Sequence, residues 1–124
     1  MIAVDTSSLV AYLEGELADD TVAIDAAIKA GSLRIPGPVL TELLSYPKVG
    51  AQVGKFIEEI PLLETAPGFW ERAGVTRRKI LSKGFKARVA DALIAQLCLD
   101  HNIPLIARDT DFRHFVNLCG LRLA

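Results

Sequence analysis

Residues 1–4 are an uninterrupted apolar run, and the run ends on Asp5. A short run without polar alternation is typical of a strand that is buried on both faces of a parallel sheet. In open α/β sheets, ligands bind just beyond the carboxyl ends of the strands. Asp5 therefore stands where a metal ligand or a catalytic base is expected. The alternative is that Asp5, Thr6 or Ser7 only caps the helix that follows.

Apolar runs alternate with helical patterns along the rest of the chain. Helices are expected over about 7–14, 19–30, 39–46, 53–60, 67–82, 90–101 and 112–118, and further strands at 33–35, 62–63, 104–107 and 121–123. Strands that alternate with helices indicate an α/β fold in which right-handed crossovers build a parallel sheet. No linker divides the sequence, so we expect a single domain over residues 1–124.

The composition favours a soluble globular protein. Of the 124 residues, 51% are hydrophobic and 23% are charged, which excludes a disordered chain and allows a sizeable core. We find no apolar run of about 18 residues and no secretory signal, so we expect no membrane association and a cytoplasmic location. Cys98 and Cys119 belong to no CxxC pair, which is typical of a reduced intracellular protein.

Charge is divided unevenly along the chain. Residues 1–75 hold five basic and eleven acidic side chains, whereas residues 76–124 hold nine basic and four acidic ones. Residues 77–88 contain no acid and six bases: Arg77, Arg78, Lys79, Lys83, Lys86 and Arg88. Such a run is usually a solvated face, but its position just before Asp91 favours a track that binds the phosphates of a nucleic acid.

Other carboxylates recur where the fold would bring them toward Asp5. Asp109 and Asp111 follow the expected strand at 104–107, while Glu42 and Asp91 are lone acids in otherwise apolar helical segments. Each lone acid either points to solvent or is buried with a partner, because an isolated buried charge is prohibitively costly. Clustered carboxylates bind hard cations such as Mg²⁺ or Mn²⁺, and one or two such ions can activate water for phosphodiester cleavage.

Other chemistries fit the sequence less well. No Ser/His/Asp or Cys/His set is visible, and we interpret His101 and His114 as structural or surface residues. An aspartyl-phosphate enzyme would need a second aspartate where Ser7 stands, and a phosphate-binding loop over 49–56 lacks the Ser or Thr that Phe56 replaces. A non-enzymatic module that binds RNA or protein through a decayed site remains an alternative.

Four segments together resemble a PIN domain, and within that superfamily the VapC toxins of bacterial and archaeal toxin–antitoxin pairs. The segments are Val4–Ser7, Thr41–Leu43, Ala90–Ala95 and Ala107–Phe112, in the family's order. The resemblance covers essentially the whole chain. It implies a three-layer α/β/α sandwich with a central parallel sheet, here of about five strands, and a ribonuclease that depends on Mg²⁺ or Mn²⁺.

The resemblance also implies residue roles. The acidic quartet that would hold the metal and carry catalysis is Asp5, Glu42, Asp91 and Asp109, with Asp111 as an accessory ligand through water. Thr6 would orient a water or a phosphate, and Arg108 would either contact the scissile phosphate or pair with an acid. The hypothesis for the mechanism is that a metal-activated water attacks the RNA phosphorus in line while bases from 77–88 hold the strand.

Partners are implied in the same way. We expect an RNA substrate, an inhibitory antitoxin protein and a homodimer, with DNA contacted only through the antitoxin. A PIN-type nuclease that processes RNA without being a toxin remains an alternative.

Overall fold

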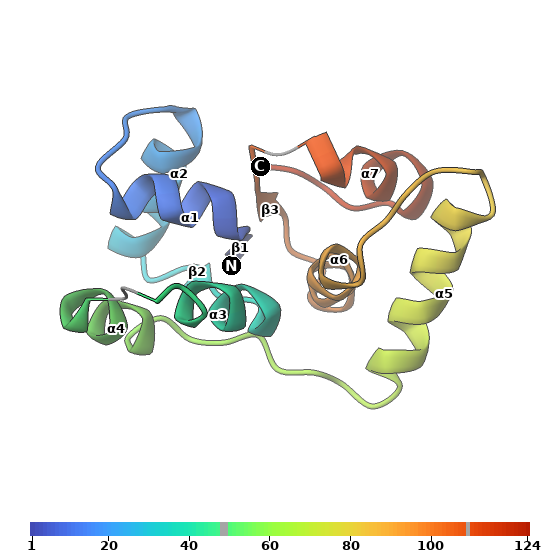
Figure 1. Ribbon diagram of the computed structural model, residues 1–124, viewed down its shortest axis with the longest axis horizontal. Coiled ribbons are helices and arrows are strands. Elements are labelled where there is room, and N and C mark those ends of the chain that lie inside the picture. The colour runs from blue at the N-terminus through green and yellow to red at the C-terminus, as the bar shows by residue number, and fades with distance from the viewer. Residues whose placement is uncertain (48–49, 109) are drawn as a thin grey trace.

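The computed structural model describes residues 1–47, 50–108 and 110–124 (Figure 1). At its centre lie three parallel strands, β1 (Ile2–Val4), β2 (Leu33–Arg34) and β3 (Leu105–Ile106), in the order β2-β1-β3. The first strand of the chain is therefore the central one. Its carboxyl end lies between those of β2 and β3, at the middle of that edge of the sheet. The predicted α/β fold with a parallel sheet is confirmed.

Two further segments extend the sheet, but only through single bridges. Ile35 bridges to Leu62 and Leu105 bridges to Leu123, both in parallel. Each outer segment makes two backbone hydrogen bonds to its neighbour, including Leu63 N–H to the Ile35 carbonyl at 3.0 Å and Ala124 N–H to the Leu105 carbonyl at 2.9 Å. The five expected strands are thus three regular strands with a one-residue pairing at each edge.

Seven α-helices and one short 3-10 helix, η1, are seen in the described residues. They are α1 (Thr6–Leu13), α2 (Asp19–Lys29), α3 (Gly37–Leu44), α4 (Ala51–Glu58), α5 (Phe69–Leu81), α6 (Val89–His101), η1 (Thr110–Phe112) and α7 (Arg113–Cys119). Each predicted helix is present, with ends displaced by a few residues. In Figure 1, α1 and α2 lie on one side of the molecule and α5, α6 and α7 on the other.

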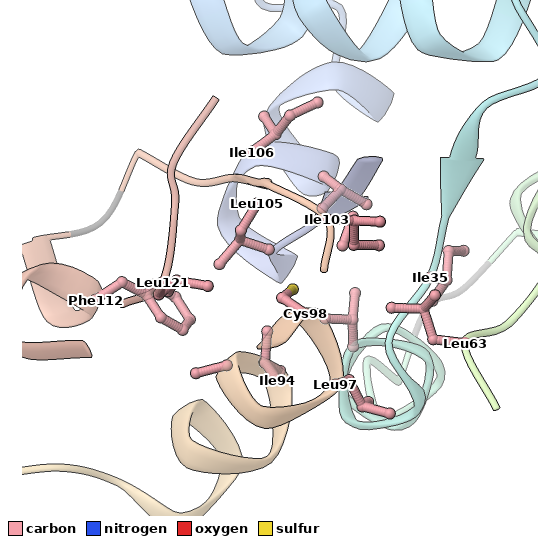
Figure 2. Packing of buried hydrophobic residues seen from close by; sticks show 14 of the residues in the cluster. Ile35, Leu63, Ile94, Leu97, Cys98, Ile103, Leu105, Ile106, Phe112 and Leu121 are labelled. Atoms are coloured by element: carbon pink, nitrogen blue, oxygen red, sulfur yellow. The ribbon is translucent and has the colours of Figure 1, made fainter. Parts of the chain in front are cut away.

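The core lies between the sheet and α6. Ala3 and Val4 of β1 and Leu105 of β3 are fully buried, as are Ile94 and Ala95 of α6. Figure 2 shows side chains of α6 pointing toward those of the segment that contains β3. Because α6 is covered on nearly every side, a charged residue on it must be compensated by neighbouring groups or by a ligand.

A chain of polar contacts joins α5 to α6. Thr76 donates a hydrogen bond to the Gln96 side chain, and Gln96 Nε2 donates to Asp100 Oδ1 at 2.8 Å. Asp100 also accepts two hydrogen bonds from Arg72. Buried polar groups that are paired in this way fix the helices in one arrangement. Helix α5, which carries Arg77, Arg78 and Lys79, is therefore held at a defined position beside α6.

The end of α6 determines where β3 ends. Asn102 adopts a left-handed conformation with φ of 53°, as predicted for a helix terminator, and the chain then turns into β3. This places Arg108 at the same sheet edge as Asp5. Across the described ranges, no helix is both long enough and apolar enough to cross a membrane.

Candidate functional site

Asp5 is fixed by its backbone at the carboxyl end of β1. Its N–H donates to the Ile106 carbonyl at 2.9 Å, and its carbonyl accepts from Leu9 N–H at 3.1 Å to start α1. Its side chain makes no capping hydrogen bond to α1, whose residues are all described. Only 6% of Asp5 is exposed. The backbone carbonyl therefore starts the helix, and the Asp5 carboxylate makes no standard capping bond but contacts the first two helical residues, Thr6 and Ser7.

The electrostatic environment of Asp5 shows which acids lie near it. Burial raises the pKa of Asp5 from 3.8 to about 6, and the negative charges of Asp91 and Glu42 also act to raise it. The Thr6 N–H and the Ser7 hydroxyl act against this change in pKa by hydrogen bonding. Two other predicted acids, Glu42 of α3 and Asp91 of α6, therefore lie within electrostatic reach of Asp5.

Thr6 connects the first and third helices at this edge. Its hydroxyl donates to Glu42 Oε1 at 3.2 Å, although the two residues lie 36 positions apart in the sequence. Glu42 is exposed, whereas Thr6 is buried. Thr6 therefore contacts one of the predicted acids, and its role in orienting a water or a phosphate stays a prediction.

Asp91 and Asp111 are bridged by an arginine. Arg88 Nε lies 3.0 Å from Asp91 Oδ2, and Arg88 Nη2 lies 3.0 Å from Asp111 Oδ2. Asp91 is almost fully buried, while the Arg88 side chain remains 68% exposed. The arginine thus compensates acids that would otherwise repel each other. Asp109, the fourth predicted quartet member, lies outside the described residues.

The chemistry of these side chains fits a hard divalent cation. Carboxylate oxygens are the ligands that Mg²⁺ and Mn²⁺ prefer, and the raised pKa of Asp5 marks a place where positive charge would be favourable. Within the described ranges, no group of three or more His, Cys, Asp or Glu side chains is arranged to hold a metal ion. Asp5 and Asp91 are the buried carboxylates among the described residues.

A groove of about 740 Å³ opens beside Asp91 and Asp111. Its basic lining residues come from three segments: Arg77, Lys86, Arg88 and Arg113. The other three bases of the predicted track line a separate groove of about 440 Å³ on α5: Arg78, Lys79 and Lys83. The six-base run is therefore divided between two grooves, and only one of these reaches the acidic residues.

Arg108 pairs with an acid in the first turn of α2 and with one in the loop before that helix. It makes a two-point contact with Asp20, at 2.7 Å from Nε and 2.9 Å from Nη2, and its Nη1 lies 3.1 Å from both oxygens of Glu16. This hydrogen bonding holds the pKa of Asp20 at about 2. Of the two roles considered for Arg108, pairing with an acid is the one seen.

Replacing Arg108 by Ala should lower the free energy of unfolding slightly, because a two-point ion pair near the surface is lost. Urea unfolding should show a smaller loss of unfolding free energy in 0.5 M NaCl than in 0.05 M NaCl, since salt screens ion pairs. The difference from wild type should also shrink as the pH falls from about 4 toward 2 and Asp20 is protonated. Arg122→Ala is the control, because Arg122 contacts uncharged atoms of Asn102. An equal salt dependence in both variants would contradict the assignment.

A family model described as the PIN domain matches residues 2–118. The chain belongs to the PIN-domain family. Three solved structures have the same fold. The first, VapBC2 from Rickettsia felis bound to a promoter DNA fragment, shares 22% identity over 100% of this chain and 98% of that chain, with a TM-score of 0.77.

The other two structures are more distant in sequence. FitAcB from Neisseria gonorrhoeae shares 15% identity over 99% of this chain and 96% of that chain, with a TM-score of 0.70. FitAB bound to the IR36 DNA fragment shares 16% identity over 100% of this chain and 94% of that chain, with a TM-score of 0.71. No curated protein sequence matches the chain. The structural likeness establishes the PIN fold.

Sequence reasoning missed several residues that line the site of this PIN domain. Arg88 is among the bases predicted to bind RNA, yet its side chain contacts Asp91. The two residues are three positions apart in the sequence, a spacing at which side chains can meet on one face of a helix. Arg113, Phe85 and His114 were not assigned to the site, although all three line the groove. Arg113 follows Asp111 closely, which was a usable signal. The approach of Phe85 to His114 depends on tertiary packing and left no local pattern.

Proposed function

We propose that this PIN domain is a divalent-metal-dependent endoribonuclease and the toxin component of a VapBC-type toxin–antitoxin pair. The observation that carries the proposal is the meeting of buried carboxylates, Asp5 and Asp91, at the carboxyl edge of a parallel sheet. A groove with four basic side chains is lined by Asp91, the second of these carboxylates. Acids for a cation and bases for phosphates are the two requirements of a phosphodiesterase.

We propose a role for each of these residues. When bound, Mg²⁺ or Mn²⁺ would activate water and offset charge on the phosphate. Asp5 and Asp91 would hold the ion, with Glu42 and Asp109 completing the acidic set and Asp111 acting through water. The Thr6 hydroxyl, which contacts Glu42, would orient a water or a phosphate oxygen. Arg77, Lys86 and Arg113 would hold the RNA backbone along the groove.

The partner proposal draws support from the solved structures of the same fold. They are described as VapBC2, FitAcB and FitAB, and two of them hold DNA fragments. By analogy, a small antitoxin would bind and inhibit this chain and would make the DNA contacts, while the toxin would form a homodimer. An RNA substrate and such a partner would be met in the cytoplasm, which is the location we propose.

The test is cleavage of labelled total RNA by the purified, partner-free chain in Mg²⁺, in Mn²⁺ and in EDTA. We expect discrete products that require the metal, and mapping of their ends would identify the substrate. Cleavage that persists in EDTA would overturn the metal dependence. RNA binding without any cleavage, together with no Mn²⁺ binding in calorimetry, would instead support an inactive binding module.

The toxin assignment needs a separate measurement, because a processing nuclease would also cut RNA. Induced expression of the chain alone should arrest bacterial growth, and co-expression with the protein encoded next to it should restore growth. Growth that continues despite active enzyme in the cells would favour the RNA-processing alternative.

A further inference from the structure

We propose that the groove beside the acidic residues binds one unpaired nucleobase of an RNA strand by stacking it on the ring pair of Phe85 and His114. The ring pair comes from two separate segments, the loop that follows α5 and helix α7. The inference rests on the proposed ribonuclease function, since it specifies how that groove recognises its substrate. It adds a base-binding subsite to the phosphate contacts already described.

The geometry of the ring pair is that of a stack. The two ring centroids lie 4.1 Å apart and the ring planes differ by 12°. Both residues line the 740 Å³ groove that also contains Asp91 and Asp111. Stacked aromatic rings present a flat surface on which a third ring can continue the stack, and every nucleobase has such a face.

The simpler interpretation is that the ring pair only fastens the loop to α7. Packing of that kind would be expected to bury the phenyl ring, because burial is what stabilises an apolar contact. Phe85 instead remains 44% exposed after stacking on His114. A large apolar ring held in a fixed orientation at the wall of a charged groove is a feature of single-strand binding sites.

The charges around the ring pair favour a nucleic acid as the occupant. Arg77, Lys86 and Arg113 line the same groove, and Arg77 is oriented by donating from Nε to the Ala87 carbonyl at 2.7 Å. These cations would bind the phosphates on either side of the stacked base. Double-stranded RNA keeps its bases inside the helix, so the groove selects an unpaired base in a loop or at an end.

The experiment measures stacking without depending on cleavage. A short single-stranded RNA that carries one 2-aminopurine would be titrated with protein in EDTA, because stacking on an aromatic ring quenches its fluorescence. We expect quenching by the wild type, and affinity lower by roughly 5- to 150-fold for Phe85→Leu, the range that corresponds to one lost base–aromatic stack. Phe85→Tyr should retain the quenching, because it keeps a ring.

Trp70→Leu is the matched control. Trp70 is also an exposed aromatic residue, 65% exposed, but it lies in the first turn of α5, at the opposite end of that helix from the groove. Its replacement should leave affinity and quenching unchanged. Circular dichroism spectra would verify that all the variants are folded, which is expected because both replaced residues are exposed.

The outcomes separate this inference from the proposed function. If the wild type cleaves RNA but Phe85→Leu binds and quenches like the wild type, the nuclease stands and the base subsite is wrong. If the wild type quenches and Phe85→Leu does not, the subsite stands even when no RNA is cleaved. Absence of quenching by the wild type would overturn the subsite whatever the cleavage assay shows.

Discussion

Replacing Asp91 by Asn is expected to reduce metal-dependent RNA cleavage by about 10³-fold or more while leaving the fold intact. Asn has the shape of Asp but no negative charge, and loss of a charged ligand removes several kcal/mol of stabilisation from a metal-assisted transition state. The change should be tolerated structurally, because it also removes the repulsion between buried Asp91 and Asp5. Loss of the Arg88 contact acts in the opposite direction.

Cleavage rates under single-turnover conditions and Mn²⁺ calorimetry would measure this effect. Asp100→Asn is the control on the same helix, since Asp100 pairs with Arg72 and Gln96 and lies away from the acidic residues. The control should lose some stability and keep its cleavage rate. Full activity of Asp91→Asn, or an equal loss in both variants, would show that Asp91 is not a metal ligand.

The parallel sheet could be predicted because its signals are local. The apolar run of β1 and the left-handed Asn102 after α6 both appear in the sequence as short patterns, and the structure confirms both. For the outer strands, the sequence predicted where they lie in the chain but not that each would pair through a single bridge. Leu62 and Leu123 pair through single bridges and stay exposed, so their pairing depends on neighbouring segments more than on their own apolar character.

The burial of Asp91 could be predicted from the sequence, but the positions of the basic side chains could not. Asp91 was identifiable as the lone acid of the otherwise apolar run Val89–Ala95, and such a residue must be compensated if it is buried. The position of a long basic side chain is set by whichever partner it reaches. Arg88 therefore contacts acids, and Arg78 lies in a different groove from Arg77, although the three belong to one run of bases.

Replacing Asp5 by Asn is expected to stabilise the protein in EDTA by up to about 3 kcal/mol at pH 7 to 8. The pKa of Asp5 is raised to about 6 in the folded protein from an ordinary value of 3.8, and a tenfold change in an acid dissociation constant corresponds to about 1.4 kcal/mol. Between about pH 4 and pH 6 the folded state holds more protons than the unfolded state, so the stability of the wild type falls as the pH rises. Asn does not titrate, so the variant avoids that loss.

Urea unfolding of both proteins from pH 4 to pH 8 would give the difference curve, in which the other titrating groups cancel. The unfolding free energies of the wild type and Asp5→Asn should be nearly equal at pH 4 and should diverge as the pH rises to about 6. Asp25→Asn should give a difference of opposite sign, because Lys29 lowers the pKa of Asp25. An Asp5 variant less stable than wild type at pH 8 would contradict the burial argument.

Adding Mn²⁺ links this stability cost to function. A ligand that binds only the folded protein stabilises it by about 2.7 kcal/mol at 100 times its dissociation constant, which is close to the penalty expected for Asp5. The wild type should therefore gain stability on addition of Mn²⁺, whereas Asp5→Asn should gain little because it has lost a charged ligand. Equal gains in both proteins would mean that the ion binds elsewhere. If Asp5 lowers the stability of the protein in EDTA but raises it when Mn²⁺ is present, the carboxylate binds the cation. A purely structural role for Asp5 would not produce this reversal.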